Sequence, residues 1–390
     1  MRRLAASGLA WALLGCLAEA PESTTVPVDG AYQVFPDQEI QPALDRAAGD
    51  PTTKVVRVHA GTYRPSSRRQ ALIWLHRRHD GIRLEAVGEV TLTAANPDLA
   101  SPDDPAYPAV VNHVVYFGDG ISRRTELHGF RITGANGFVI NSGETSPIEP
   151  NDRLPKGVYF YTDGGGIKIF GRSYPTIRNT VIADNLARPC GAGVSVEHLG
   201  FIDDSVLFDG CIFRGNRTQV TGSAIDLLPG SAATIRNSLF VGNLSNEGEN
   251  YVPATGDRDY NGEHGSGALT VFAGSRAIVS RSTFTANRNG VDDRGEGSLY
   301  ENNVFWANDA PGGTAPGRRY ELDVTASASV RGNRIGGGTI GDLQGVLDPA
   351  QLDAPDPEFD AHYRPLAPVY RDVGYRPTTP DPPSLEESSA

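Results

Sequence analysis

A short phrase that ends in asparagine recurs along the middle of this chain. Each copy opens on a mainly apolar pair and continues through two small or polar residues to Asn: Val181–Asn185, Ile212–Asn216, Leu239–Asn243, Thr283–Asn287 and Val304–Asn308. A repeat every 20–45 residues or so is typical of a solenoid, in which each coil buries its face against its neighbours. Because a side-chain amide can bond the same residue one coil away, we interpret these asparagines as an internal ladder rather than a binding stripe.

A second set of short strands is predicted, one in each coil. The period-2 alternation places Ile167, Val194, Ile225, Leu269 and Leu322 inside the solenoid. The residues that follow them, Lys168, Ser195, Asp226, Thr270 and Asp323, then face outward. Because stacked strands lie about 4.8 Å apart, we expect these outward side chains to form one continuous row on a single sheet.

Composition limits the classes of partner. The formal net charge is -12, from 35 basic and 47 acidic residues. Phosphate binding needs a basic face, so nucleic acid is not an expected partner. The 45 glycines and 28 prolines fit many short strands joined by turns.

The N-terminus reads as an export signal. Arg2 and Arg3 precede a short apolar stretch, so residues 1–15 are predicted to be a signal peptide and residues 16–30 a tether. The segment Leu13–Cys16 resembles the lipobox of bacterial lipoproteins, which implies a lipid on Cys16 as the only membrane attachment; an ordinary secretory signal is the alternative. At the other end, residues 376–390 are predicted to be a disordered tail.

Two cysteines remain if Cys16 carries a lipid. Cys190 and Cys211 lie at different places in the repeated phrase. An oxidising compartment permits a disulfide between them, and two buried thiols are the alternative.

Further patterns mark the two ends of the solenoid. A helical stripe and strand over Ile40–Tyr63, followed by Gly81–Ala94 and Leu127–Gly137, resemble the first coils of right-handed parallel β-helix proteins of the pectin-lyase-like superfamily. Asp356–Phe359 and Asp372–Gly374 resemble the closing segment of bacterial surface β-helix proteins. The resemblance implies an all-β, right-handed parallel β-helix solenoid with an N-terminal helical cap over residues 31–345, and a C-terminal cap segment over residues 346–375. That superfamily holds lyases, hydrolases, epimerases and adhesins, so the resemblance does not fix the chemistry.

In this superfamily the substrate groove lies along an outward sheet face, which implies a polysaccharide or cell-surface glycan as partner of the outward row. A polysaccharide lyase needs a base, usually Arg or Lys, to remove the proton beside a uronate carboxylate. The candidate catalytic residues are Asp163, Lys168, Arg172, Glu197, His198 and Asp226. The candidates for sugar contact are Phe170, Ser195, Thr270 and Phe272. The alternative for the whole row is a solvated face of mixed charge.

One segment has the spacing of a calcium loop. Asp257, Asp259 and Asn261 alternate before a glycine, with Glu263 close behind, so their oxygens could converge on one cation. Ala268 stands where an EF-hand loop has its bidentate Glu, and an Asx-rich surface turn is the alternative.

These observations predict an exported, monomeric cell-envelope protein that engages carbohydrate. A lyase acting on an acidic polysaccharide is the first expectation, and a hydrolase with two carboxylates about a glycosidic bond is the second. A non-enzymatic adhesin or envelope scaffold is the alternative, because the sequence contains no complete catalytic motif.

Overall fold

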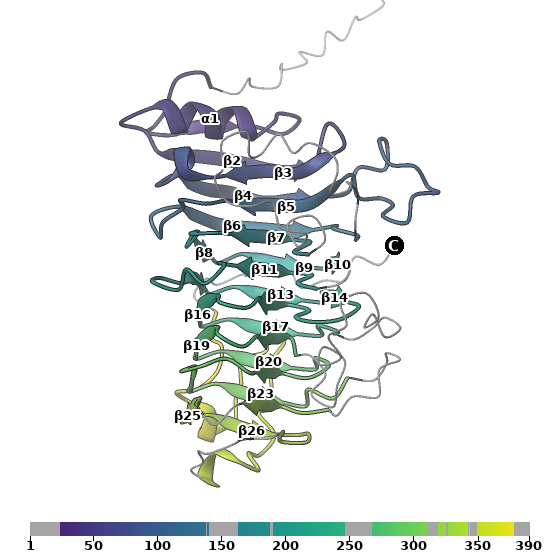
Figure 1. The fold of residues 1–390 in the computed structure, drawn as a ribbon, viewed down its shortest axis with the longest axis vertical. Coiled ribbons are helices and arrows are strands. Elements are labelled where there is room, and N and C mark those ends of the chain that lie inside the picture. The colour runs from purple at the N-terminus through teal and green to yellow at the C-terminus, as the bar shows by residue number, and fades with distance from the viewer. Residues whose placement is uncertain are drawn as a thin grey trace, which may run out of the picture.

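The chain folds into a parallel β-helix. The structure, a computed structural model, describes residues 24–137, 139, 163–187, 190–245, 267–310, 319–324, 327–341, 343 and 349–377. The strands stack coil upon coil along one long axis (Figure 1). Every strand pair within the sheets is parallel, as the repeated phrase predicts.

One face of the solenoid is an eight-stranded sheet, which holds the predicted second set of strands. Residues one coil apart are aligned, as in the pairing of Ile167 with Val194 and of Val194 with Ile225. The strands, in sheet order, are β3 (Arg69–Leu75), β5 (Val111–Phe117), β7 (Ile167–Phe170), β11 (Val194–Glu197), β15 (Ile225–Leu227), β18 (Leu269–Val271), β21 (Val291–Asp293) and β24 (Leu322–Val324).

The other faces belong to a sixteen-stranded sheet. It opens with β1 (Tyr32–Val34) and the long strands β2 (Val55–Tyr63), β4 (Arg83–Thr93) and β6 (Glu126–Thr133). After β6 each coil contributes two short strands. The first row is β8 (Thr176–Arg178), β12 (Val206–Asp209), β16 (Ala232–Arg236), β19 (Arg276–Ser280), β22 (Leu299–Glu301) and β25 (Ser329–Arg331). The second row is β9 (Val181–Ala183), β13 (Ile212–Arg214), β17 (Leu239–Val241), β20 (Thr283–Thr285), β23 (Val304–Trp306) and β26 (Arg334–Gly336), and β10 (Leu186–Ala187) pairs with β14 (Arg217–Thr218) beside it.

A helix lies at the N-terminal end of the solenoid. The helix α1 (Gln41–Gly49) buries Ala43, Leu44 and Ala47 against the first strands (Figure 1). The Gln41 side chain accepts a hydrogen bond from the Trp74 N–H and donates one to the Trp74 carbonyl, at 2.9 and 3.2 Å. Backbone groups at the open edge of β3 are thereby satisfied, which blunts an otherwise exposed sheet edge. A short helical turn, η1 (Arg77–His79), follows β3.

The repeated asparagines form an internal ladder, which confirms the sequence interpretation. The Nδ2 groups of Asn185, Asn216, Asn243 and Asn287 each donate to Oδ1 of the next asparagine, at 3.0, 3.0, 2.9 and 2.7 Å. Asn308 closes the ladder on the Glu321 carboxylate. Inside the same coils Phe213, Phe240, Phe284 and Phe305 stack with ring centroids 4.6, 4.1 and 5.0 Å apart.

The C-terminal segment runs back along the solenoid. We call residues 354–376 the C-terminal strap; η4 (Pro349–Gln351) precedes it and η5 (Pro368–Tyr370) lies within it. Its backbone N–H groups bond successively earlier coils, from Ala354 on Ile335 to Arg376 on Asn237. Tyr375 packs on Val181, Ile212 and Leu239. The strap therefore covers the outer face of the β9–β26 row.

The two ends of the chain lie partly outside the described residues. Residues 1–23, which include the predicted signal peptide and Cys16, and residues 378–390 of the predicted tail are not described. From residue 24 the chain is already bonded to the first coil, since Thr24 N–H donates to the Gln33 carbonyl. No helix within the described residues is long and apolar enough to cross a membrane.

Cys190 and Cys211 are both buried free thiols, so the disulfide alternative is wrong.

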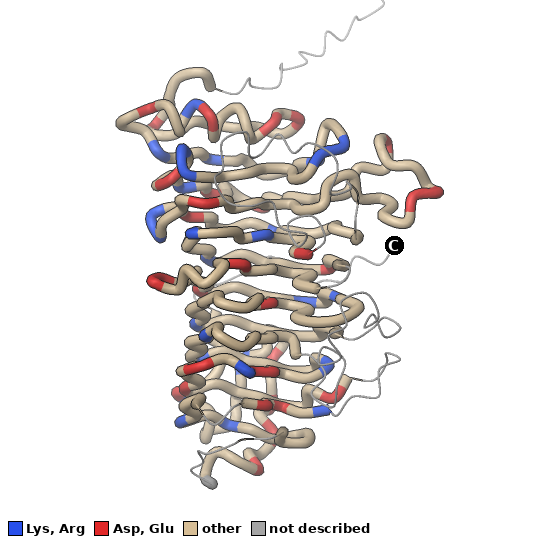
Figure 2. The backbone as a smooth tube through the Cα atoms, viewed as in Figure 1, with Lys and Arg blue, Asp and Glu red and all other residues tan. Residues whose placement is uncertain are grey.

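Charged residues of both signs line the edge that carries β8, β16, β19 and β25 (Figure 2). Several of them pair between coils, as Asp209 does with Arg236 at 2.8 Å. This edge is a solvated face of mixed charge.

Candidate functional site

The outward face of the eight-stranded sheet carries one continuous row of polar side chains. Strand register aligns them coil by coil, and we call Lys168, Ser195, Asp226, Thr270, Asp292 and Asp323 the polar row. The predicted row is confirmed in its order. Sequence reasoning missed Asp292, because its strand reads Val-Asp-Asp and lacks the second apolar residue that marks the alternation in the other strands.

The polar row is buried, so the expectation of a solvent-facing row is wrong. Lys168, Ser195 and Asp226 are 0% exposed, and Thr270, Asp323 and Asp292 are only 4, 5 and 7% exposed. Two residues of the row are contacted by side chains that precede them by five residues in the sequence. Asp163 reaches Lys168, and Thr221 reaches Asp226 at 3.0 Å.

A glycine makes the contact between Thr221 and Asp226 possible. Gly222 lies between Thr221 and Asp226 with φ +60°, and a Cβ added to it would lie 2.4 Å from the Asp226 Cβ. An L side chain at residue 222 would therefore clash and be strained. The tight turn brings the Thr221 hydroxyl onto the row.

The ammonium group of Lys168 is buried and has an acceptor for each of its three donors. It donates to Asp163 Oδ2 at 2.7 Å, to Glu197 Oε2 at 2.9 Å and to Ser195 Oγ at 3.2 Å. Burial alone lowers the pKa of this ammonium, but the two carboxylates outweigh burial and raise it. Lys168 is consequently positioned as a buried cation rather than as a base.

Asp226 is only partly compensated by hydrogen bonds. Its Oδ2 accepts the Thr221 hydroxyl, while Oδ1 has no hydrogen-bond partner among the described residues. Burial raises its pKa to about 7, and the Asp163 carboxylate adds to the rise. The Cys190 thiol also bonds Asp226, and burial raises the pKa of that thiol. Cys190 and Thr221 are members of this cluster that sequence reasoning did not identify.

The far end of the row is acidic. Asp292 and Asp323 are register partners on adjacent strands, and burial raises the pKa of Asp292. The positive charge of Arg294, which is partly exposed, opposes this rise. The neighbouring Asp293 points the other way and accepts the Tyr300 hydroxyl at 2.7 Å, so Asp293 is a core residue.

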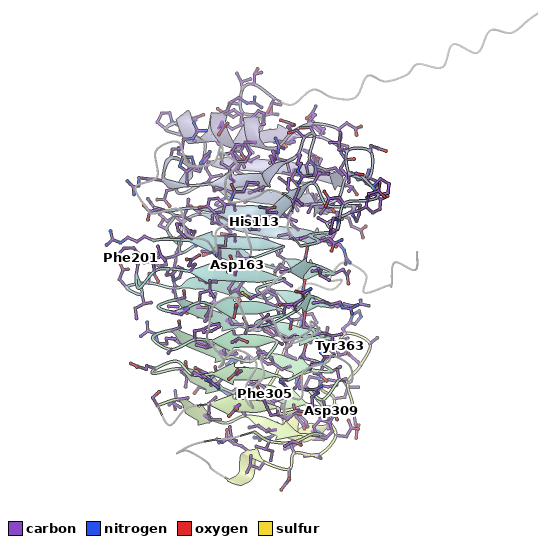
Figure 3. All side chains as sticks on the ribbon, turned by 45° about the vertical axis from the view of Figure 1, so that its right-hand side comes forward. His113, Asp163, Phe201, Phe305, Asp309 and Tyr363 are labelled. Atoms are coloured by element: carbon purple, nitrogen blue, oxygen red, sulfur yellow. The ribbon has the colours of Figure 1, made fainter. Side chains whose placement is uncertain are left out.

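Two of the predicted catalytic residues lie elsewhere. Arg172 is exposed and its guanidinium stacks over Phe201 at 4.1 Å. Phe201 is on the edge of the solenoid, away from Asp163 (Figure 3). The His198 ring donates from Nε2 to the Ser173 carbonyl at 2.9 Å and accepts the Ala232 N–H at 3.2 Å. Burial lowers the pKa of His198 to about 4, so this ring is a neutral structural group.

The predicted sugar-contacting aromatics differ in access. Phe170 is 2% exposed and is covered, whereas Phe272 is partly exposed beside Thr270. The predicted calcium ligands Asp257, Asp259, Asn261 and Glu263 lie outside the described residues. Within the described ranges no group of three or more His, Cys, Asp or Glu side chains could hold a metal ion.

Comparison with known proteins adds little to the site. No protein-family model matches the chain, and no curated protein matches its sequence. Among solved structures, the crystal structure of pectate lyase Pel9A matches with a TM-score of 0.41 and 16% identity, over 80% of this chain and 78% of that chain. The chemistry of the site therefore rests on this chain's own residues.

Proposed function

We propose that the chain engages carbohydrate at the acidic end of the polar row and hydrolyses a glycosidic bond there. The observation that carries the proposal is the adjacent placement of Asp292 and Asp323 on one sheet face. They keep small exposed fractions of 7% and 5%, and partly exposed Phe272 and Arg294 border them. An aromatic ring, an arginine and two carboxyl groups are a set suited to holding a sugar.

The spacing of the two carboxyl groups fits glycoside hydrolysis. Adjacent strands are about 4.8 Å apart, and retaining glycosidases keep their two carboxyl groups about 5–5.5 Å apart. Burial raises the pKa of Asp292, which suits a general acid that protonates the leaving oxygen. Asp323 is then the carboxyl that attacks or stabilises the anomeric carbon.

Hydrolysis is favoured over β-elimination by the state of the candidate bases. Lys168 is 0% exposed and donates to two carboxylates, and Arg172 stacks on Phe201 away from the row. Neither cation is available to take a proton from a uronate. This reverses the order of the two chemistries expected from the sequence.

The charge of the row favours a neutral glycan over the acidic polysaccharide first expected. Asp226, Asp292 and Asp323 lie on its face, and its lysine is already paired. The lysine of the row is therefore not available to neutralise the carboxylates of an anionic chain. Export through the N-terminal signal, with a lipid on Cys16, remains part of the proposal and would bring the protein to cell-envelope or external glycans.

The test is a screen of the purified mature chain on neutral and uronate-containing polysaccharides, with and without calcium. We expect reducing ends from a neutral polymer and no ultraviolet absorbance of unsaturated uronate. Asp292→Asn and Asp323→Asn should each lower kcat/KM by about 10²–10⁴-fold, as loss of an acid–base group does. Asp209→Asn, on the mixed-charge edge, is the matched control and should leave the rate unchanged.

Two outcomes contradict the proposal. An unsaturated uronate signal identifies a lyase instead. Silence on every polymer, together with no glycan bound on an array, supports the non-enzymatic adhesin or scaffold.

A further inference from the structure

The buried cluster around Lys168 holds an amine and a carboxyl group in contact. Lys168 Nζ lies 2.7 Å from Asp163 Oδ2, and both side chains are 0% exposed. Glu197 Oε2 lies 2.9 Å from the same nitrogen, with 7% of its side chain exposed. Figure 3 places Asp163 over the middle strands of the solenoid.

The two oxygens of the Asp163 carboxyl group lie in different surroundings. The Ser195 hydroxyl donates to Oδ2, the same oxygen that faces the amine. Oδ1 is buried and accepts no hydrogen bond from any described residue. The carboxyl is thus polarised on one side and unsolvated on the other.

We propose that Lys168 and Asp163 condense spontaneously to an intramolecular isopeptide bond, with Glu197 as the proton shuttle. This modification goes beyond the proposed glycan chemistry and does not depend on it. It also removes Lys168 permanently from any role as a base.

The reaction balances without an added reagent. A proton moves from Nζ to Asp163 across their hydrogen bond, which gives a neutral amine and a carboxylic acid. Nζ then attacks Cγ, Glu197 accepts the N–H proton and returns one to the departing hydroxyl, and water leaves. The Nζ–Cγ bond forms, the Cγ–O bond breaks, and Glu197 ends in the state in which it began.

The site favours this condensation for two physical reasons. Reacting atoms held at roughly 3–3.5 Å in a fixed orientation react with a high effective concentration, and a hydrogen-bonded amine lies close to that range of the carboxyl carbon. Amide formation also replaces a buried ion pair, which is costly to desolvate, by a neutral group. Burial raises the pKa of Glu197, which makes its carboxylate a stronger proton acceptor than an exposed glutamate.

Tryptic peptide mapping of the purified full chain tests the proposal. Trypsin cleaves after an unmodified Lys168 but not after an acylated one. The expected product is the peptide of residues 157–172, uncut at Lys168 and lighter than its sequence by one water. Fragmentation should give no backbone ions between residues 163 and 168, because the isopeptide closes a ring there.

A matched variant separates the isopeptide from its isobaric alternative. Asp163 precedes Gly164, and such pairs can lose one water as a succinimide. Lys168→Arg keeps the buried charge but cannot form the amide, so the water loss should disappear with it; a succinimide would persist. Glu197→Gln, with folding checked by circular dichroism, should slow formation by about 10²-fold or more, measured as the cross-linked fraction at fixed times after refolding.

Normal cleavage after Lys168 in the wild-type chain, with the peptide at its unmodified mass, overturns the proposal. A water loss retained by Lys168→Arg, or a cross-link mapped to Glu197 instead of Asp163, overturns it as well.

Discussion

Lys168 and Asp226 occupy the same row two strands apart, and their ionisable groups are in opposite situations. Lys168 has two carboxylates and a hydroxyl within hydrogen-bond distance. Asp226 has one hydroxyl and one thiol, and no cation bonds it directly among the described residues. A buried charge without a paired partner is costly, so the residue that stands out energetically is Asp226.

Asp226 should make the protein less stable as pH rises. Its pKa in the folded protein is about 7, against 3.8 for an unperturbed aspartate, because burial disfavours the charged form. The folded state therefore binds more protons between those two values, and the free energy of unfolding falls as pH rises through that window. Asp226→Asn should remove this loss and stabilise the protein at pH 8, by an amount on the order of a few kcal/mol, and much less at pH 4.

Urea unfolding at pH 4 and pH 8 measures this prediction. Asp209→Asn serves as control, since Asp209 pairs with arginine at the surface. An Asp226→Asn variant with the pH dependence of the wild type would show that the carboxyl stays charged in the fold.

At the scale of the element, the asparagine ladder joins successive coils at one corner. Each rung uses the side-chain oxygen as acceptor for both the backbone N–H and the amide of the previous asparagine, as Asn243 does for Asn216. The Nδ2 group of Asn243 also bonds the Phe213 carbonyl, at 2.9 Å. One amide thus satisfies backbone groups that the tight turn leaves without strand partners.

Replacing a central asparagine of the ladder should therefore lower the free energy of unfolding. Asn243→Ala leaves the Asn216 N–H and the Phe213 carbonyl without this partner in the interior, which we expect to lower the free energy of unfolding by about 2–4 kcal/mol. Asn136→Ala, which removes an exposed side-chain hydrogen bond, is the matched control and should cost about 0.5 kcal/mol or less. Chemical denaturation measures both, and equal effects would mean that the ladder contributes little.

The C-terminal strap is the second element with a distinct stabilising role. Tyr375 is 2% exposed and packs on the outward side chains of β9, β13 and β17. Tyr375→Ala should lower the free energy of unfolding by about 3 kcal/mol and raise the binding of a hydrophobic dye, because it uncovers Val181 and Ile212. Stability and dye binding that match the wild type would show that the strap is not needed to cover this face.

For the whole molecule, the parallel β-helix could be predicted because each coil requires the same short sequence patterns. A buried Asn in each coil and an alternating strand leave a signal in the sequence, and both were identified. The burial of Lys168 and Asp226 was not predicted, because Asp163 and Thr221, each five residues earlier in the sequence, contact them through tight turns. Nothing in the spacing of those residues indicates these contacts before the glycine turns are seen in three dimensions.

The candidate site was predictable in position and not in chemistry. The row from Lys168 to Asp323 was predicted from alternation alone. Asp292 was missed because its strand, Val-Asp-Asp, does not alternate between apolar and polar residues. The role of Lys168 was misjudged because exposure was assumed. Arg172 was grouped with Lys168 by sequence proximity, although the chain turns at Gly171 and carries it to the edge.

Glycan should bind at the acidic end of the polar row. A crystal structure of the mature chain with an oligosaccharide of the neutral polymer selected by the screen tests this. We expect a sugar in contact with Phe272, Asp292 and Asp323. Sugar bound elsewhere would contradict it, above all in the open cavity of about 410 Å³ lined by Asp184, Arg217 and Leu244.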